Sequence, residues 1–109
     1  MPSEEPRYVW LMVFFDLPVK SKKQRRVATK FRKFLVDDGY IMLQYSVYTR
    51  ICNGQDAVTK HMGRLTKSLP GEGSVRSLQV TDRQYARMKT LVGKQRPEEN
   101  LGTEQMVLL

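Results

Sequence analysis

The stretch YVWLMVFF, residues 8–15, decides the fold of this chain. It consists of eight consecutive apolar or aromatic residues, and its short length with its β-branched and aromatic content favours a strand over a helix. A strand with one face in solvent would alternate apolar and polar residues, and this one does not. We therefore predict a strand that is buried on both faces of a sheet.

The segment after this strand has the pattern of an amphipathic helix over residues 21–37. Ser21 followed by Gln24 matches a capping box, and Gly39 suits the position just after the last helical turn. Helical spacing places five apolar residues on one stripe: Val27, Ala28, Phe31, Phe34 and Leu35. The sequence therefore predicts a helix that packs this stripe against the sheet.

Three more elements follow. Residues 40–51 are rich in strand formers and predict a strand that bends near Gln44, which would create a hairpin. Residues 55–69 predict a second amphipathic helix, and residues 74–80 alternate as a strand would. The apolar positions of that second helix are Val58, Met62, Leu65 and Leu69.

The C-terminal part is less regular. Residues 84–93 alternate, which predicts one or two further short strands. A charged linker over residues 94–103 leads to an apolar end within residues 104–109. We predict a folded domain over residues 1–93 and, over residues 94–109, a linker and a terminal strand that pairs with the other protomer or a partner.

The order of elements predicts an α+β fold of the ferredoxin-like βαββαβ type, with an antiparallel sheet, both helices on one face and an additional C-terminal strand. Such an arrangement leaves the other face of the sheet bare. Because YVWLMVFF makes that face apolar, it needs a cover, and a second copy packed sheet to sheet would supply one. We therefore expect a two-fold homodimer.

The positive charge of the chain lies in one segment. The 109 residues, enough for one domain, carry 19 Lys and Arg against 11 Asp and Glu, a net charge of +8. Eight of the bases and no acid fall within residues 20–33, so the rest of the chain is balanced at 11 against 11. They are Lys20, Lys22, Lys23, Arg25, Arg26, Lys30, Arg32 and Lys33.

This basic segment is either a solvated helix face or a polyanion-binding surface. A solvated face would mix acids with bases, because pairs of opposite charge four residues apart stabilise helices. A segment of bases alone gains nothing from its own repulsion, so we predict binding to nucleic-acid phosphates. The candidate nucleic-acid-binding residues are Lys20, Lys22, Lys23, Arg25, Arg26, Lys30 and Lys33.

Asp16 is the one carboxylate at the end of the first strand. Its side chain could accept hydrogen bonds from backbone amides at the strand-to-loop corner, as aspartates often do. It could instead bind Mg²⁺, which proteins hold through one or two carboxylates together with waters and phosphate oxygens. A two-fold axis near the strand end would bring Asp16 of both protomers together and supply the second carboxylate.

Other candidate residues are weaker. Ser46 and Arg50 are placed as possible neighbours of Asp16, or on an outward face of the sheet. We expect His61 to be a surface or partly packed residue and Cys52 a small packed one. We expect six aromatic residues to serve the core and the dimer interface and not base stacking: Tyr8, Trp10, Phe14, Phe15, Tyr45 and Tyr48.

The sequence has features of a cytoplasmic protein. Its single cysteine allows no disulfide within one chain, which fits a reducing compartment. Its N-terminus lacks the layout of a signal peptide, and no apolar run reaches the length of a membrane span. There is no phosphate-binding P-loop, dinucleotide fingerprint or zinc spacing. We therefore expect no membrane partner.

Three segments resemble the small CRISPR-associated adaptation proteins of the Cas-two family. They are FFDLP at 14–18, KFRKFLVDDGYIMLQYSVYTR at 30–50 and VTDRQYARMKTLVG at 80–93. The resemblance covers residues 7–93 and the terminal strand at 104–109. The sequences of these segments are most similar to those of members that accompany a single-protein effector nuclease, as in type II systems. It rests on the order and spacing of these segments and not on any single motif.

The resemblance implies a ferredoxin-like homodimer whose C-terminal strand extends the sheet of the partner protomer. It also implies a bridge between two dimers of the CRISPR integrase subunit, which holds a short DNA duplex for spacer acquisition. The acid that the family links to a metal and to endonuclease activity falls on Asp16, and no second acidic motif matches. The resemblance thus implies Mg²⁺ as the candidate cofactor.

Three functions remain open from the sequence. The first is a structural DNA-binding adaptor, which we rank first because binding residues are plentiful and catalytic ones scarce. The second is a metal-dependent phosphodiesterase that uses paired Asp16 residues. The third is a stand-alone, toxin-like endoribonuclease on the same fold, acting on RNA without an integrase.

Overall fold

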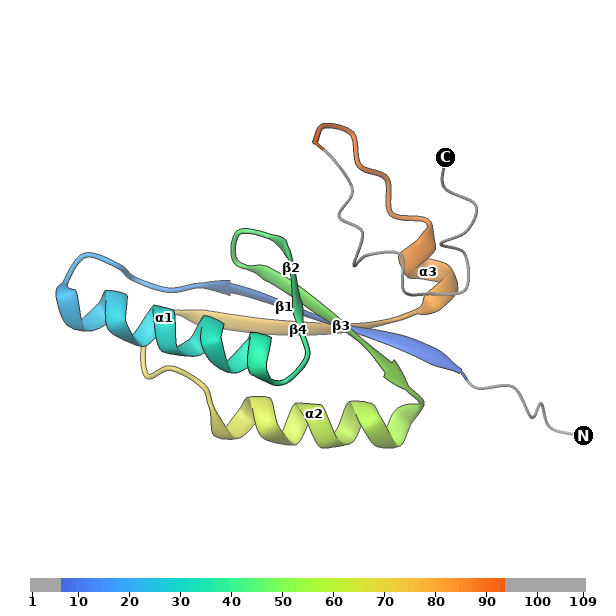
Figure 1. Cartoon of the computed structure of the whole chain (residues 1–109), viewed down its shortest axis with the longest axis horizontal. Coiled ribbons are helices and arrows are strands. Elements are labelled where there is room, and N and C mark those ends of the chain that lie inside the picture. Colours follow the sequence, from blue (N-terminus) through green and yellow to red (C-terminus); the bar gives the residue numbers. More distant parts are fainter. Residues whose placement is uncertain (1–6, 94–109) are drawn as a thin grey trace, which may run out of the picture.

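The computed structural model describes residues 7–93, which form an α+β domain (Figure 1). A four-stranded antiparallel sheet has the strand order β2-β3-β1-β4. This order is compatible with the predicted ferredoxin-like arrangement. Along the chain the elements are β1 (Tyr8–Asp16), α1 (Lys22–Asp37), β2 (Ile41–Gln44), β3 (Val47–Asn53), α2 (Gln55–Lys67), β4 (Ser74–Thr81) and α3 (Asp82–Ala86).

Strand β1 lies in the interior of the sheet, as its apolar run predicts. It pairs with β3 from Tyr8 opposite Asn53, and with β4 as far as Asp16 opposite Ser74. Leu11, Val13 and Phe15 belong to a buried cluster with residues of α1 and α2, whereas Trp10 and Met12 belong to a second cluster. Because successive side chains of a strand point to opposite faces, both faces of β1 are buried, which confirms the prediction.

Helices α1 and α2 cover the same face of the sheet (Figure 1). The predicted capping box of α1 is present, since Ser21 Oγ accepts from the Gln24 backbone N–H at 3.0 Å and Gln24 Oε1 accepts from the Ser21 N–H at 3.0 Å. Helix α1 buries Ala28, Phe31 and Leu35 against the sheet. Gly39 has φ +93°, so it ends the helix in a conformation that a side chain would strain.

The predicted bend near Gln44 is a tight turn between β2 and β3. Ser46 has φ 70°, and its carbonyl oxygen accepts a hydrogen bond from Phe15 N–H at 3.0 Å. This bond holds the turn against the end of β1. Helix α2 is shorter than predicted, because it ends at Lys67, and Leu69 is 49% exposed.

The prediction of strands over residues 84–93 is wrong. Thr81 and Gln84 form a capping box that starts the short helix α3 immediately after β4. The Tyr85 ring stacks on the Trp10 ring with centroids 3.9 Å apart, and Trp10 Nε1 donates to Asp82 Oδ1 at 2.8 Å. A local cap and the burial of one aromatic pair thus override the alternating pattern.

The remaining prediction for this part of the chain, a terminal strand at 104–109, lies outside the described residues. None of the helices within residues 7–93 has the length and apolar character needed to cross a membrane.

Candidate nucleic-acid interface

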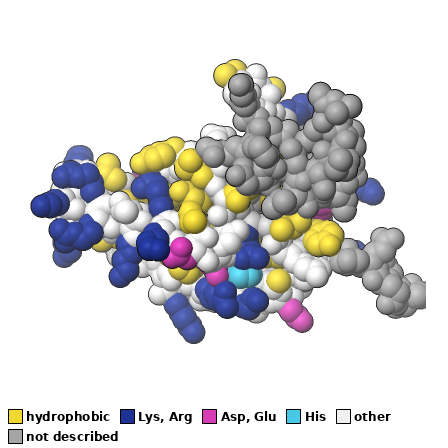
Figure 2. Space-filling model, viewed as in Figure 1, with side chains coloured by type: hydrophobic (Ala, Val, Ile, Leu, Met, Phe, Trp, Pro, Cys, Tyr) yellow, Lys and Arg dark blue, Asp and Glu magenta, His cyan; other side chains and the backbone are white. Residues whose placement is uncertain are grey.

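The seven candidate phosphate-binding residues are all exposed. We call them the basic surface of α1, and they comprise Lys20, Lys22, Lys23, Arg25, Arg26, Lys30 and Lys33. Figure 2 shows lysine and arginine side chains gathered at the left end of the molecule, where α1 begins in the same view of Figure 1. Within residues 7–93 only Lys33 among the seven pairs with a carboxylate, that of Asp37 at 2.9 Å. The remaining charges are therefore available to an anionic ligand.

Arg25 differs from the other six residues. One of its guanidinium nitrogens, Nη1, donates to the Val19 and Lys20 carbonyl oxygens at 3.2 and 2.9 Å. These bonds tie the loop between β1 and α1 to the first turns of the helix. Arg25 therefore shapes the basic surface as well as adding charge to it.

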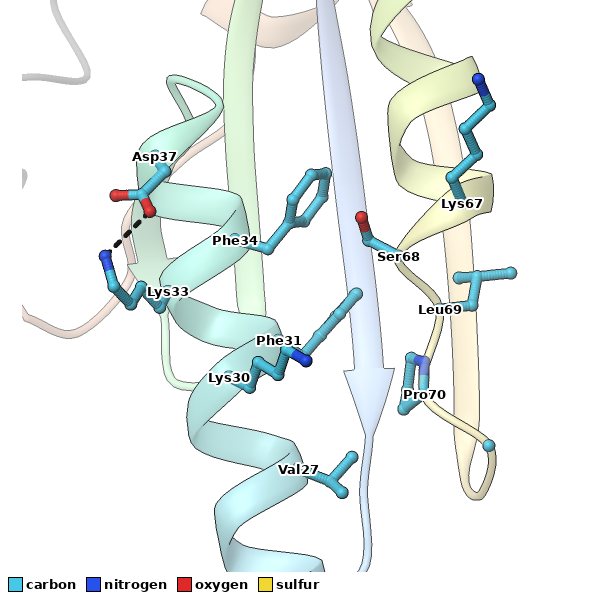
Figure 3. Close-up of a pocket in the computed structure, with 11 residues that line it drawn as sticks. Val27, Lys30, Phe31, Lys33, Phe34, Asp37, Lys67, Ser68, Leu69 and Pro70 are labelled. Carbon is cyan, nitrogen blue, oxygen red and sulfur yellow. Dashed lines mark hydrogen bonds and ion pairs between the residues drawn. The ribbon is translucent and has the colours of Figure 1, made fainter.

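A groove borders this surface (Figure 3). It has a volume of about 650 Å³ and lies between α1 and the segment after α2. Lys30 and Lys33 line it from α1, and Lys67 lines it from α2. Its other lining residues include Val27, Phe31, Phe34, Leu69 and Pro70. The groove thus has apolar residues between three lysines, one of which, Lys33, is paired with Asp37 in the same lining.

Asp16 ends β1 with an exposed side chain. Within residues 7–93 its carboxylate makes no hydrogen bond or ion pair with the protein, so the expected bonds to backbone amides at the strand corner are not seen. Gly73, with φ +91°, packs closely here, because a Cβ on it would lie 2.5 Å from the Asp16 carbonyl oxygen. The strand end is therefore compact in its backbone while the carboxylate faces solvent.

The residues around Asp16 do not form a complete metal site in one chain. No group of three or more His, Cys, Asp or Glu side chains suited to a metal ion occurs in the described part of the chain. One carboxylate alone leaves most of the Mg²⁺ coordination sphere to water and substrate. A metal at Asp16 would thus need further ligands from water, substrate or a second copy of the chain.

Of the two predicted neighbours of Asp16, only Ser46 lies at that end of the sheet. Its carbonyl oxygen is bonded to Phe15, the residue before Asp16. Arg50 pairs across the strands with Leu11, five residues earlier in β1, which corresponds to about 17 Å along a strand. The possible placement of Arg50 beside Asp16 is therefore not found within this chain, because the register of β3 against β1 puts Arg50 in the middle of β3.

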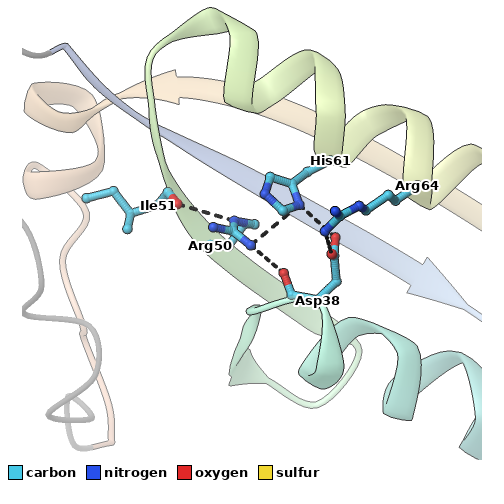
Figure 4. A network of polar contacts seen from close by, with 5 residues as sticks. All are labelled: Asp38, Arg50, Ile51, His61 and Arg64. Atoms are coloured by element: carbon cyan, nitrogen blue, oxygen red, sulfur yellow. Dashed lines mark hydrogen bonds and ion pairs between the residues drawn. The ribbon is translucent and has the colours of Figure 1, made fainter.

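Arg50 instead belongs to a polar network with Asp38 and two residues of α2 (Figure 4). Arg50 Nη1 donates to the Asp38 carbonyl oxygen. The Asp38 carboxylate accepts from His61 Nδ1 at 2.8 Å and from Arg64 Nη1 at 2.7 Å. His61 is 4% exposed, so its prediction as a surface or partly packed residue is wrong, and it is a buried link between α2 and the end of α1.

Opposing effects act on the Asp38 carboxyl. Burial alone would raise its pKa, but the hydrogen bonds and positive charges of Arg64 and His61 outweigh burial and lower it. The sequence reasoning did not identify Asp38 at all. The available signal was the i, i+3 spacing of His61 and Arg64, which places two donors on one face of a helix.

The remaining predicted residues are placed as follows. Cys52 is buried as expected, and burial raises the pKa of its thiol, which keeps it neutral. Trp10, Phe15 and Tyr48 are buried core residues, as predicted. Tyr45 is not a core residue, since it is 74% exposed at the tip of the β2–β3 hairpin.

Comparison with known proteins identifies the family of this chain. The family model of the CRISPR-associated protein Cas2 matches residues 9–88. A protein named CRISPR-associated endoribonuclease Cas2 from Acidovorax ebreus is 63% identical over 83 residues, which covers 76% of this chain and 81% of the relative. Proteins of the same name from Flavobacterium psychrophilum and Ligilactobacillus salivarius are 39% and 40% identical, and the alignments cover 94% and 91% of this chain and 89% and 98% of the relatives.

The family match spans every strand of the sheet and both large helices, and it includes the basic surface of α1, Asp16 and Tyr45. The resemblance drawn from three short segments is thereby confirmed over most of the described residues. The chain belongs to the CRISPR-associated Cas2 protein family.

Proposed function

We propose that this protein is an adaptor subunit for CRISPR spacer acquisition. In this role a homodimer binds the DNA duplex that is to be inserted and bridges two dimers of the integrase subunit. The observation that carries the proposal is the basic surface of α1, whose seven bases are all exposed on one helix and its preceding loop. Phosphate contacts of this kind hold a duplex without reading its sequence, which suits an adaptor for DNA of varied origin.

The proposed dimer rests on the face of the sheet opposite α1 and α2. Trp10 and Met12 are buried on that face, whereas Phe14, Leu43 and Val47 are only partly covered and Leu78 is 52% exposed. A second copy packed on this face would remove these side chains from water. Light scattering at micromolar concentration would then give the mass of a dimer, and the mass of a monomer would contradict this part of the proposal.

The basic surface is tested by reversing two charges. We expect Lys22→Glu with Arg26→Glu to weaken binding of a short DNA duplex and to lower the slope of log affinity against log salt by about 1.8 in magnitude for each protomer that contacts the duplex, since each lost phosphate contact removes about 0.9. Neither residue makes an ion pair within residues 7–93, so the fold does not depend on their charges. Fluorescence anisotropy of a labelled duplex at several salt concentrations measures both quantities.

The matched control is Lys60→Glu with Arg83→Glu, which changes the net charge by the same amount at exposed positions of α2 and α3. It should leave the salt slope near the wild-type value. Equal slopes for wild type and the α1 variant would show that the duplex does not bind the basic surface.

A metal-dependent nuclease is the second candidate function. Two observations favour it: the Asp16 carboxylate is exposed and unpaired in the described residues, and the relatives above carry the name endoribonuclease. In this candidate Asp16 of both protomers binds Mg²⁺, which when bound would stabilise charge on a phosphodiester undergoing attack. Cleavage of RNA or DNA by the protein alone, dependent on Mg²⁺ and lost in Asp16→Asn, would favour this function. Cleavage of RNA in particular would support the stand-alone, toxin-like endoribonuclease.

A further inference from the structure

The tip of the β2–β3 hairpin presents an aromatic side chain to solvent beside the basic surface of α1. Tyr45 is 74% exposed, and the next residue, Ser46, has φ 70°, an uncommon conformation for a residue with a side chain. A ring this exposed contributes little hydrophobic stabilisation to the fold and remains accessible to a ligand.

Tyr45 is held in place by an arginine of α1. The Arg32 guanidinium lies over the Tyr45 ring at 4.3 Å from its centroid and over the Phe15 ring at 5.4 Å. Arg32 Nη2 also approaches Ser46 Oγ at 3.5 Å, and Arg32 Nε is buried without a hydrogen-bond partner within the described residues. Arg32 is therefore packed between two rings and fixes Tyr45 against the helix that carries the phosphate-binding bases.

The same end of the molecule contains the other parts of the candidate site. The Ser46 carbonyl oxygen accepts a hydrogen bond from the Phe15 N–H, so the hairpin tip lies next to the end of β1, where Asp16 is exposed. Arg32 precedes Lys33 of the basic surface in the same helix. The contact with Arg32 therefore places the Tyr45 ring against α1, the helix that carries most of the phosphate-binding bases.

We infer that Tyr45 is a stacking platform for an unpaired nucleobase, so that this protein binds single-stranded as well as duplex nucleic acid. An exposed ring held in position is what a base with a free π face requires, and it orders few torsions on binding. Bases inside a duplex are stacked on each other and offer no such face, so the platform acts only on a frayed or single strand. The inference rests on the proposed function in one respect, because the phosphates of that strand are bound by the basic surface of α1.

The probes are a 12-nucleotide single-stranded DNA that contains 2-aminopurine and the duplex of the same length. We expect Tyr45→Ala and Tyr45→Leu to weaken single-strand binding by about 5- to 150-fold, the range measured for loss of one stacked base. Tyr45→Phe keeps the π face and should bind as wild type does. Quenching of 2-aminopurine fluorescence on binding should occur in wild type and Tyr45→Phe and be lost in the other two variants.

Duplex affinity separates this inference from the proposed function. Tyr45→Ala and Tyr45→Leu should bind the duplex within about twofold of wild type, as should Leu91→Ala, a control at an exposed position after α3. Unchanged single-strand binding in Tyr45→Ala, with salt-dependent duplex binding intact, overturns the stacking platform alone. An equal loss for both probes also overturns it, and a wild-type protein that binds neither probe overturns the proposed function as well.

Discussion

Asp38→Ala should lower the free energy of unfolding by about 3 kcal/mol, the lower end of the range for removing one partner of a buried ion pair. The Asp38 side chain is 6% exposed and accepts hydrogen bonds from His61 and Arg64. Arg64 is 53% exposed and can return to water, whereas His61 is buried and loses its acceptor. Urea unfolding followed by circular dichroism measures the change.

The neighbouring residue provides the control for Asp38. Asp37 is an exposed acid whose pairing with Lys33 lies on the helix surface, so Asp37→Ala should cost less than about 0.5 kcal/mol. Similar stabilities for the two variants would show that the Asp38 network does not join α1 to α2.

The Asp38 network also gives stability a dependence on pH. Because the pKa of Asp38 is lower in the folded protein than in the unfolded chain, its contribution is complete above the usual aspartate pKa of about 3.9. It is lost as the pH falls below that value toward the folded pKa. Wild type should therefore lose more stability than Asp38→Asn between pH 5 and pH 3, and parallel curves would contradict this assignment.

Trp10→Ala should be at least as destabilising, with an expected loss of about 3–5 kcal/mol. Trp10 is 1% exposed, stacks on Tyr85 with an interplanar angle of 8° and donates to Asp82. The change would leave a cavity on β1 and release α3 from the sheet. Urea unfolding by circular dichroism is the measurement, since the variant has no tryptophan to monitor.

Trp10→Phe separates the two roles of this side chain. Phenylalanine retains an aromatic ring for Tyr85 but cannot donate to Asp82, so it should cost less than alanine. If alanine and phenylalanine were equally and only slightly destabilising, the second cluster would not contribute to the stability of the domain.

The elements with strong local signals were predictable from the sequence. The capping box of α1 acts through contacts between residues near in sequence. The unbroken apolar run of β1 and the apolar stripe of α1, which includes Phe31 and Leu35, act through burial. The basic surface was also predictable, because residues 20–33 contain eight bases and no acid that could neutralise them.

The errors arose where tertiary contacts override a local pattern. Residues 84–93 alternate, yet Tyr85 stacks on Trp10, which is 75 positions earlier in the sequence. Arg50 is predicted either near Asp16 or on an outward face of the sheet, because periodicity does not give the register of β3 against β1. The sequence predicts His61 as a surface or partly packed residue because its acceptor, Asp38, is 23 residues away.

These errors change the interpretation of the site. Arg50 and His61 both bind Asp38 and not Asp16, whose carboxylate makes no ion pair within residues 7–93. The basic surface of α1, in contrast, keeps six of its seven bases free of carboxylates within residues 7–93. The proposed adaptor function rests on these free charges.

The most direct test of this account is integration of a short DNA duplex into a CRISPR-array target by this protein and its cognate integrase subunit. Wild type would be compared with Asp16→Asn and with Lys22→Glu/Arg26→Glu, after assembly of each complex is verified by size-exclusion chromatography. We predict that Asp16→Asn integrates the duplex as wild type does and that the α1 variant loses most of its activity. Failure of Asp16→Asn within an assembled complex, with full activity of the α1 variant, would contradict the adaptor function.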